Sequence, residues 1–261
     1  MQKLLTIFGL TVAAIVAIAA YPYVQMTDGK ILITNGKIQF APSWTPISGL
    51  MAHWKMNDNA GNTTVAENIS SNNGTAKQNT STLHRSGKID GAINFNGSSD
   101  LLTLSNGTNF PTGDRTICAW VNVATTSGVH CIHDYGTRSA DQDWAFNIRD
   151  NKLEASIYAN AMYGVSTAIT TGTWLHVAVT YSNAIKTSVF YINSTSETPV
   201  VCSTQPATLP SDLSRIGSLI YQAEGYYHFN GNIDDLRVYN RALTSAEISA
   251  IYNDGDGTED E

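Results

Sequence analysis

Short runs in which apolar and polar residues alternate constrain the fold of this chain more than any other sequence feature. In the run from Ile117 to Val123, every second residue is apolar. The same pattern recurs in the runs 144–148, 153–157, 175–181 and 190–192. Successive side chains of a strand point to opposite faces, so each run would bury one face and expose the other. Turn-forming Asn, Gly and Ser clusters separate the runs, which predicts an all-β fold of two stacked antiparallel sheets.

The length and charge of the chain limit what it can be. Its 261 residues suit one sandwich domain with short appendages, and only 14% of them are charged, against about 25% in an average soluble protein. The net charge is −7, with 15 basic residues scattered among 22 acidic ones. Binding to phosphates requires clustered Lys and Arg, so the sequence argues against a nucleic-acid partner.

A short helix is predicted near the C-terminus, from Ser245 to about Asn253. Thr244 is a favourable N-cap, and Glu247 three residues later completes a capping box. Five of the eight residues in 254–261 are acidic, which predicts a disordered, solvated tail.

Residues 1–20 are predicted to form a hydrophobic helix that acts as a signal peptide or as a membrane or assembly anchor. Residues 4–20 are apolar apart from two threonines and follow Lys3, as in a secretory signal. A helix of this length would span about 26 Å, slightly less than the roughly 30 Å of a hydrocarbon core. Both the cleaved and the retained forms place the rest of the chain outside the cell, as a secreted or cell-surface protein. Contact with a membrane is expected only through residues 4–20, if they are retained.

Residues 21–48 are predicted to contain a β-hairpin around Asn35 and Gly36, a dipeptide that favours a tight two-residue turn. A lone hairpin is marginal in water, so it would dock on the main domain, pair with another chain in a homo-oligomer, or form a stalk. The three cysteines form no metal-binding pair, and free buried thiols are favoured over a bridge between Cys118 and Cys131.

Several motifs in order along residues 49–253 resemble laminin-G-like and concanavalin-A-like jelly-roll domains. The segments 49–58 and 86–100 are similar to the opening of that family and to a glycine-rich motif that follows it. The segments 116–121 and 173–181 are similar to two of its central strands, and 229–243 with 245–248 to its closing strand and helix. The resemblance implies a jelly-roll sandwich, an extracellular location and a binding role. It also implies that a structural calcium ion and a glycan or protein ligand are possible.

The calcium site that the resemblance implies would use Asp58, Asp100, Asp234 and Asp235. Calcium binds six to eight oxygen ligands, and carboxylates supply many of them. Strand alternation would place Asp234 on the same face as Leu236, where a buried carboxylate needs a partner. A metal could be that partner, but so could turn N–H groups or Arg237, and the sequence leaves these alternatives open.

A sugar-binding surface would combine exposed aromatic rings with polar side chains. The candidates are Tyr135, Tyr226 and Tyr227, with Glu224 nearby, and the alternative is that such rings belong to the core. His130 and His133 lie three residues apart, so strand alternation would place them on opposite faces and prevent joint action.

The sequence contains no catalytic motif for hydrolysis, such as Gly-x-Ser-x-Gly or His-Glu-x-x-His, so we expect that the protein is not an enzyme. The leading hypothesis is an extracellular glycan-binding module with a structural calcium ion. The alternative is a structural or adhesive surface protein, such as a spike or filament subunit, that uses the sandwich for display and its N-terminal segment for anchoring or assembly.

Overall fold

The computed structural model describes residues 47–104, 106, 109–158, 160–163, 168–209, 214–220 and 227–259, together with four short strands before residue 41. The chain divides into two units, one of residues 1–46 with residue 261 and one of residues 47–260, and each is described by itself.

The described part of the first unit consists of two strand pairs. Strands β1 (Leu5–Ile7) and β2 (Leu10–Val12) pair antiparallel, and so do β3 (Ile31–Thr34) and β4 (Lys37–Phe40). The helix predicted over residues 4–20 is wrong for the residues described there, whose Leu, Thr, Ile and Val suit a strand. The rest of that segment, and the predicted Asn35-Gly36 turn, lie outside the described residues. In the part of the chain that the structure describes, no helix has the length and apolarity to cross a membrane.

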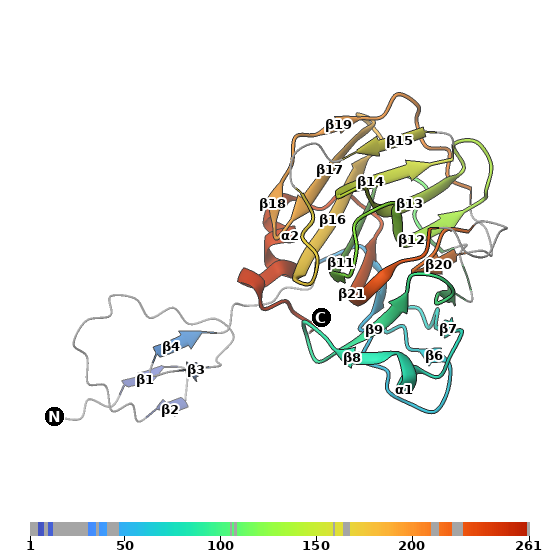
Figure 1. Ribbon diagram of the computed structural model, residues 1–261. Helices are drawn as coiled ribbons and strands as arrows, with labels where there is room; N and C mark the ends of the chain where they lie inside the picture. The colour runs from blue at the N-terminus through green and yellow to red at the C-terminus, as the bar shows by residue number, and fades with distance from the viewer. Residues whose placement is uncertain are drawn as a thin grey trace. The chain divides into compact units, whose positions relative to one another are not determined.

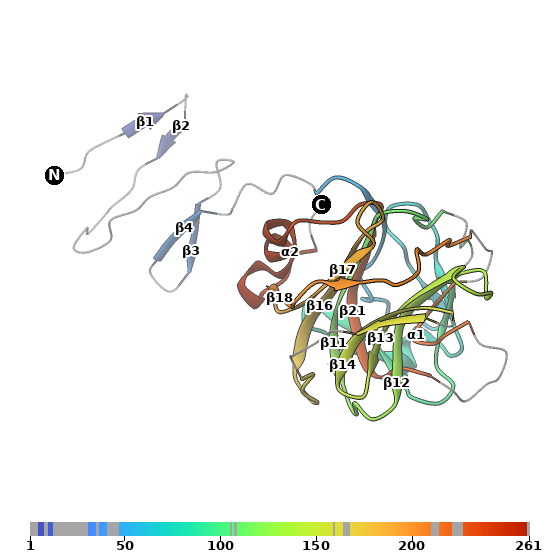
Figure 2. The same cartoon turned by 90° about the horizontal axis from the view of Figure 1, so that it is seen from above.

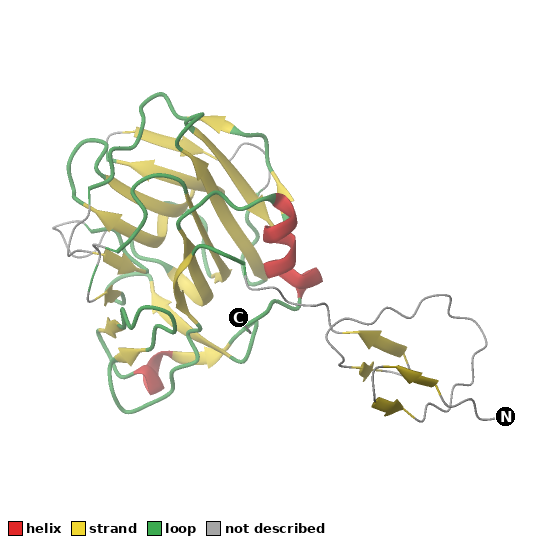
Figure 3. Cartoon of the chain, turned by 180° about the vertical axis from the view of Figure 1, so that it is seen from behind, coloured by secondary structure: helices red, strands yellow, loops and turns green. Residues whose placement is uncertain are grey.

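The second unit is a sandwich of two sheets in which every pair of neighbouring strands is antiparallel (Figures 1 and 3). The eight-stranded sheet contains, in spatial order, β15 (Asn160–Tyr163), β14 (Lys152–Ile157), β13 (Asp143–Arg149), β12 (Val129–Gly136), β20 (Ser214–Ile216), β10 (Leu102–Leu104), β7 (Gly74–Ala76) and β6 (Thr64–Val65). The nine-stranded sheet contains β18 (Thr195–Ser196), β17 (Thr187–Ile192), β16 (Trp174–Ser182), β11 (Arg115–Val123), β21 (Asn230–Tyr239), β9 (Gly91–Asn96) and β8 (His84–Ser86), with β19 (Val200–Val201) beside β17 and β5 (Leu50–Trp54) beside β21. A single-turn helix, α1 (Thr80–Leu83), precedes β8.

The core lies between the sheets and is built from the apolar residues of the alternating runs. All of the predicted inward residues are buried there, and they are Ile117, Ala119, Val121, Val123, Trp144, Phe146, Ile148, Leu153, Ala155, Ile157, Leu175, Val177, Val179, Tyr181, Phe190 and Ile192. The sequence prediction of two stacked antiparallel sheets is confirmed.

Two β-bulges shift the alternation where the sequence did not indicate it. In β12 the register against β13 slips between Cys131 and His133, so His130 and His133 pair with Ile148 and Phe146. Both histidines are therefore buried on the inner side, and their predicted placement on opposite faces is wrong.

In β21 a similar slip occurs opposite Trp120 and Cys118, and Asp235 has a positive φ of 49°. Asp234 pairs with Trp120 on the outer side of the sheet, whereas Leu236 lies in the core between the sheets. The prediction that Asp234 shares a face with Leu236 is wrong, because the extra residue of the bulge reverses the alternation.

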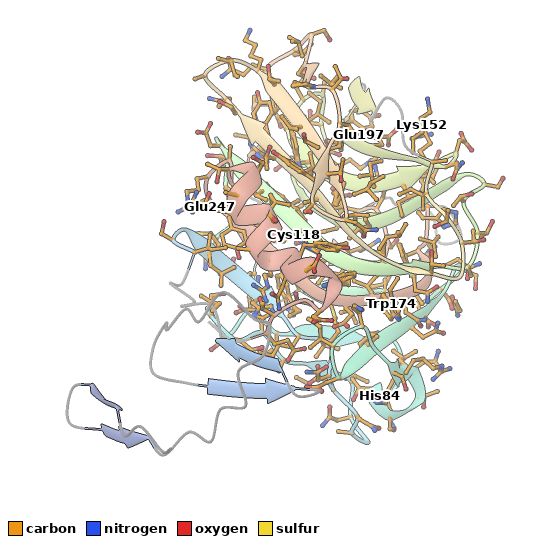
Figure 4. All side chains as sticks on the ribbon, turned by 90° about the vertical axis from the view of Figure 1, so that its left-hand side faces the viewer. His84, Cys118, Lys152, Trp174, Glu197 and Glu247 are labelled. Atoms are coloured by element: carbon orange, nitrogen blue, oxygen red, sulfur yellow. The ribbon has the colours of Figure 1, made fainter. Side chains whose placement is uncertain are left out.

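Helix α2 (Ser245–Tyr252) covers the outer face of the nine-stranded sheet, on the side away from β12–β14 (Figure 2). The predicted capping box of Thr244 and Glu247 is present. Tyr252 stacks on Trp120 of β11, with ring centroids 5.6 Å apart. Figure 4 looks onto this face, with α2 in front of the strands and Cys118 labelled beside it.

The residues that follow α2 are ordered, so the disordered tail predicted for 254–261 is wrong for 254–259. A 3₁₀ helix, η1, spans Asn253–Gly255. The backbone carbonyl of Thr258 accepts a hydrogen bond from Arg237, and Glu259 accepts one from Asn57 at 3.0 Å. A buried guanidinium and an amide thus anchor an acidic segment whose composition alone resembles that of a solvated tail. Residues 260 and 261 lie outside the described part.

Cys118, Cys131 and Cys202 are buried, and no disulfide joins any two of them, as the favoured prediction expected.

Candidate functional site

The outer face of the eight-stranded sheet carries polar side chains in the middle of its longest strands. Because Phe146 and Ile148 point into the core, Asn147 and Arg149 of β13 point outward. We define the polar strip as the outward side chains Cys131, Asp134, Asp143, Asn147, Arg149, Glu154, Ser156 and Arg215.

The strand register aligns the polar strip in two rows across the sheet. In one row, Asn147 pairs with Cys131 of β12 and with Glu154 of β14. In the other, Asp134 pairs with Arg215 of β20 on one side and with Ala145 on the other, and Ala145 pairs with Ser156. Directly opposed residues lie on the same face, so these side chains share one surface.

Asn147 is the centre of a hydrogen-bonded group on this surface. Its Nδ2 donates to Glu154 Oε1 at 2.9 Å and to Ser156 Oγ at 3.0 Å. Arg149 Nε donates to the other oxygen of Glu154 at 2.5 Å, which forms an ion pair with the buried carboxylate. The amide oxygen of Asn147 is fully buried and accepts no hydrogen bond.

Asp134 has a second unsatisfied acceptor. Its Oδ2 accepts a hydrogen bond from Ile220 N at 2.7 Å, whereas the buried Oδ1 has no partner. Burial raises the pKa of Asp134 well above its usual value, and the neighbouring carboxylate of Asp143 raises it further. Both causes favour the protonated, uncharged carboxyl, which suits a side chain that is fully buried.

Cys131 contributes no reactive thiolate to the strip. Burial raises the pKa of its thiol well above the usual value, and the carboxylates of Asp134 and Glu154 act in the same direction. A protonated, buried thiol is inert. The strip is therefore a buried hydrogen-bonded group from which Arg149, Ser156 and Arg215 are partly exposed.

Exposed tyrosines lie at both ends of the polar strip. Tyr227 is 37% exposed, and its backbone carbonyl accepts a hydrogen bond from Cys131 N at 3.4 Å. Tyr158 is 41% exposed, and its backbone N–H donates to the carboxylate of Asp143. The guanidinium of Arg138 lies 4.6 Å from the Tyr158 ring centroid.

The predicted ligand-binding residues have different outcomes. Tyr227 lies beside the polar strip, whereas Tyr226 and Glu224 fall outside the described residues. Tyr135 is only 1% exposed, so its prediction as a sugar platform is wrong. It points inward after the bulge in β12, and its hydroxyl donates to the Pro111 carbonyl at 3.0 Å.

The predicted calcium ligands Asp58 and Asp100 each have hydrogen-bond donors of their own. Asp58 Oδ1 accepts from Ala66 N at 3.1 Å. The two oxygens of Asp100 accept from Gln78 Nε2 at 2.9 Å and Asn96 N at 3.2 Å.

Asp234 and Asp235 are also bound within the protein. Asp234 Oδ2 accepts from the backbone N–H groups of Lys88 and Ile89 at 2.8 and 2.9 Å. Asp235 Oδ1 contacts His53 Nε2 at 2.6 Å and Arg237 Nε at 3.1 Å. Among the residues that the structure describes, no group of three or more His, Cys, Asp or Glu side chains is arranged to hold a metal ion. The contacts of Asp234 and Asp235 are the alternative partners, turn N–H groups and Arg237, and calcium at the four predicted residues stays a prediction.

Sequence reasoning missed the polar strip, although part of its signal was present. The same alternation that identified Phe146 and Ile148 as inward residues also marks Asn147 as outward, between Arg149 and Ala145. The placement of Asp134 beside Ala145 depends on the bulge in β12, which no residue pattern indicated.

Solved structures of similar fold include several carbohydrate-related proteins. Domain 4 of AbnA, an extracellular arabinanase from Geobacillus stearothermophilus in complex with arabinotriose, matches with a TM-score of 0.59 and 19% identity, over 77% of this chain and 97% of that one. The CBM40 of a Ruminococcus gnavus sialidase bound to α2,3-sialyllactose matches with a TM-score of 0.52 and 15% identity, over 61% and 95% of the two chains. Trypanosoma rangeli sialidase in complex with sialic acid matches with a TM-score of 0.57 and 17% identity, over 82% of this chain but only 34% of the sialidase.

At these identities the likeness shows the fold alone. No curated protein matches the sequence. The family model of the concanavalin A-like lectin/glucanases superfamily matches residues 96–249, more than half of the chain. The resemblance found in the sequence is thereby confirmed, and the chain belongs to the concanavalin A-like lectin/glucanases superfamily.

Proposed function

We propose that the sandwich is a non-enzymatic glycan-binding module displayed outside the cell, and that the polar strip with Tyr158 and Tyr227 is its binding surface. The observation that carries the proposal is the outward polar strip, whose partly exposed Arg149, Ser156 and Arg215 lie near two exposed tyrosine rings. Carbohydrate-bound domains of the same fold, the arabinanase domain and the CBM40, make a sugar ligand plausible chemistry for this scaffold.

A sugar has groups that match both the polar side chains and the tyrosine rings of this surface. Sugar hydroxyls both donate and accept hydrogen bonds, so they would bind to the partly exposed side chains of Arg149, Ser156 and Arg215. The apolar C–H faces of a sugar ring would pack on the rings of Tyr158 and Tyr227, whose hydroxyls remain available to water or ligand.

The direct test is a glycan array probed with the full chain and with the Ser156→Ala variant, because Ser156 is a partly exposed member of the strip. We expect the variant to bind about tenfold more weakly, which corresponds to about 1.4 kcal/mol for the loss of one hydrogen bond to the ligand. The matched control is Asn122→Ala, which removes an amide from the outer face of the other sheet, where Asn122 pairs with Asn232. Equal binding by all three proteins would reject the polar strip as the site.

A second arm of the array contains EDTA. The proposal assigns binding to protein side chains, so we expect glycan binding to persist after chelation. Binding that disappears with EDTA and returns with calcium would show that an ion holds the ligand instead.

The N-terminal unit favours an additional role in anchoring or assembly. Its described strands form two-stranded pairs, and an isolated pair of this size is marginal in water. We propose that residues 1–46 pair with a second chain or with another surface. Light scattering should show that deletion of residues 1–46 lowers the number of chains per particle, and an unchanged number of chains would contradict this role.

A further inference from the structure

Asn-x-Ser/Thr triplets are concentrated in one stretch of the sequence, between residues 62 and 108. They begin at Asn62, Asn68, Asn73, Asn79, Asn96 and Asn106. Beyond residue 108 the chain has one further triplet, at Asn193, although asparagines continue to the C-terminal helix. This triplet is the acceptor sequence for N-linked glycosylation of exported proteins. A composition rich in Asn, Ser and Thr would scatter such triplets along the whole chain, so the concentration indicates a role for this part of the fold.

In four of these triplets the structure exposes both residues that the modification requires. The asparagines are Asn62, Asn68, Asn73 and Asn79, and all four are exposed. The hydroxyl residue of each triplet is exposed as well, and these are Thr64, Ser70, Thr75 and Ser81. In contrast, Asn72 precedes one of them without starting a triplet and is buried. The sequence thus places its acceptor triplets where an enzyme can reach them.

The hydrogen bonds of these asparagines leave the amide nitrogen available. Asn62 Oδ1 accepts from the backbone N–H two residues later at 2.9 Å, and Asn73 Oδ1 accepts from Glu67 N at 2.9 Å. Asn79 makes no side-chain capping hydrogen bond at the start of the described helix α1. An N-linked sugar is attached to Nδ2 and leaves Oδ1 in place, so the bonds of Asn62 and Asn73 would persist. Asn96 differs, because its Nδ2 donates within its own turn at 2.9 Å.

The four triplets lie beside the edge strands at one end of the sandwich. Strand β6 ends the eight-stranded sheet, and β8 ends the nine-stranded one. Asn62 precedes β6, Asn68 and Asn73 lie between β6 and β7, and Asn79 precedes α1 and β8 (Figure 1). An uncovered edge strand can pair with another chain, and a bulky group beside it hinders that pairing. The polar strip is distant, because β7 and β13 are separated by four strand spacings of about 4.8 Å each.

We propose that Asn62, Asn68, Asn73 and Asn79 are N-glycosylation sites, and that their glycans cover the edge strands β6 and β8 and leave the polar strip uncovered. The inference rests on the display outside the cell that the proposed function includes. In the reaction, Nδ2 forms a bond to C1 of a sugar that is carried on a lipid phosphate. The bond from C1 to the phosphate oxygen breaks, the lipid phosphate leaves with the electron pair, and Nδ2 loses one proton. A glycosyltransferase of the export pathway would catalyse this step.

The test is mass spectrometry of peptides from the full chain, purified from the organism that produces it. We expect a sugar on the peptides that contain each of the four asparagines. Asn68→Gln and Asn79→Gln, produced in the same organism, should each lack one glycan. The matched control is Asn59→Gln, an exposed asparagine before β6 that starts no triplet, and it should lack none. Unmodified peptides at all four positions would overturn the proposal.

A second measurement tests whether the glycans cover the edge strands. The full chain is also produced in a host without N-glycosylation, and light scattering counts the chains per particle as the concentration rises. We expect the unmodified chain to form particles with at least about twice as many chains, because its edge strands can pair. Equal numbers for both forms would overturn the covering role.

The outcomes distinguish this inference from the proposed function. Unmodified asparagines in a chain that binds the glycan array would overturn the glycosylation sites and leave glycan binding standing. Modified asparagines in a chain that binds nothing on the array would support the sites and contradict the binding function.

Discussion

At the scale of single residues, the fold depends on carboxylates that organise backbone N–H groups. Glu67 is nearly buried and accepts hydrogen bonds from His53 N at 2.8 Å, Ile69 N at 2.8 Å, Ser70 N at 2.6 Å and Asn72 N at 3.1 Å. Burial alone would raise the pKa of Glu67, but these hydrogen bonds outweigh it and hold the pKa below its usual value. One side chain thus fixes the loop between β6 and β7.

Replacing Glu67 with Gln should therefore destabilise the protein in a pH-dependent way. The native pKa is lower than the value of about 4.3 in the unfolded chain, so the ionised carboxylate stabilises the fold above that pH. This stabilisation is lost as the pH falls through the native pKa. We expect Glu67→Gln to lower the free energy of unfolding by about 1–3 kcal/mol at pH 7, and by less at pH 3. Urea unfolding at both pH values measures this, and an equal loss at both would contradict the role of the charge.

The pKa of Asp234 is shifted in the opposite direction, above its usual value. Burial raises its pKa to about 8, despite hydrogen bonds from the backbone N–H groups of Ile89 and Lys88, and the nearby carboxylate of Asp235 adds to the shift. The native state therefore holds a proton that the unfolded state loses above a pH of about 3.9, so stability falls as the pH rises toward 8.

Asp234→Asn should remove this loss of stability at high pH, because an amide does not ionise. The amide oxygen can still accept the hydrogen bonds from Lys88 N and Ile89 N. We expect the variant to be more stable than the native protein at pH 9, with a smaller difference at pH 5. Thermal melting at the two pH values checks the prediction. A variant that is less stable at pH 9 would indicate that a cation or another donor stabilises the ionised carboxylate.

At the scale of elements, the segment after α2 is part of the covering of the nine-stranded sheet. A Cβ added to Gly257 would lie 2.4 Å from Ile89 Cδ1 and 2.9 Å from Trp120 Nε1, so the segment packs closely on both side chains. Arg237 is fully buried beneath it and donates to the Thr258 carbonyl. Lys55 and Asn57 contact Glu259 at its end.

Deleting residues 254–261 should uncover Trp120 and deprive Arg237 of the Thr258 acceptor. We expect a red shift of tryptophan fluorescence and a loss of about 1–3 kcal/mol in the free energy of unfolding. Deletion of residues 260 and 261 alone is the control, because it leaves these described contacts in place. Identical spectra and stabilities for both deletions would show that the segment does not cover the sheet.

For some strands and helices the sequence predicted the correct buried face, and for others it did not. The faces of β11, β13, β14 and β16, and the capped helix α2, followed from patterns within single segments. The bulges in β12 and β21 did not, because a bulge is a mismatch between two strands and is defined only once they are paired. Errors at His133, Tyr135 and Asp234 all come from applying strict alternation across such a point.

At the scale of the whole sandwich, the two outer faces have different characters. The nine-stranded sheet is covered by α2 and the segment that follows it, with Trp120 and Arg237 buried beneath. The eight-stranded sheet carries the polar strip, which combines residues from β12, β13, β14 and β20 and is mostly buried. These strands are brought together by a strand order, with β12 next to β20, that a single sequence does not reveal. The candidate site therefore became visible only with the fold.

The most direct test of this account is chemical-shift mapping of the isotope-labelled full chain, titrated with the oligosaccharide that binds most tightly on the glycan array. We predict that the largest changes occur at the side-chain amide of Asn147 and at backbone amides of Cys131, Asp134 and Glu154. Changes confined to β11, β16 and α2, with the polar strip unaffected, would contradict it.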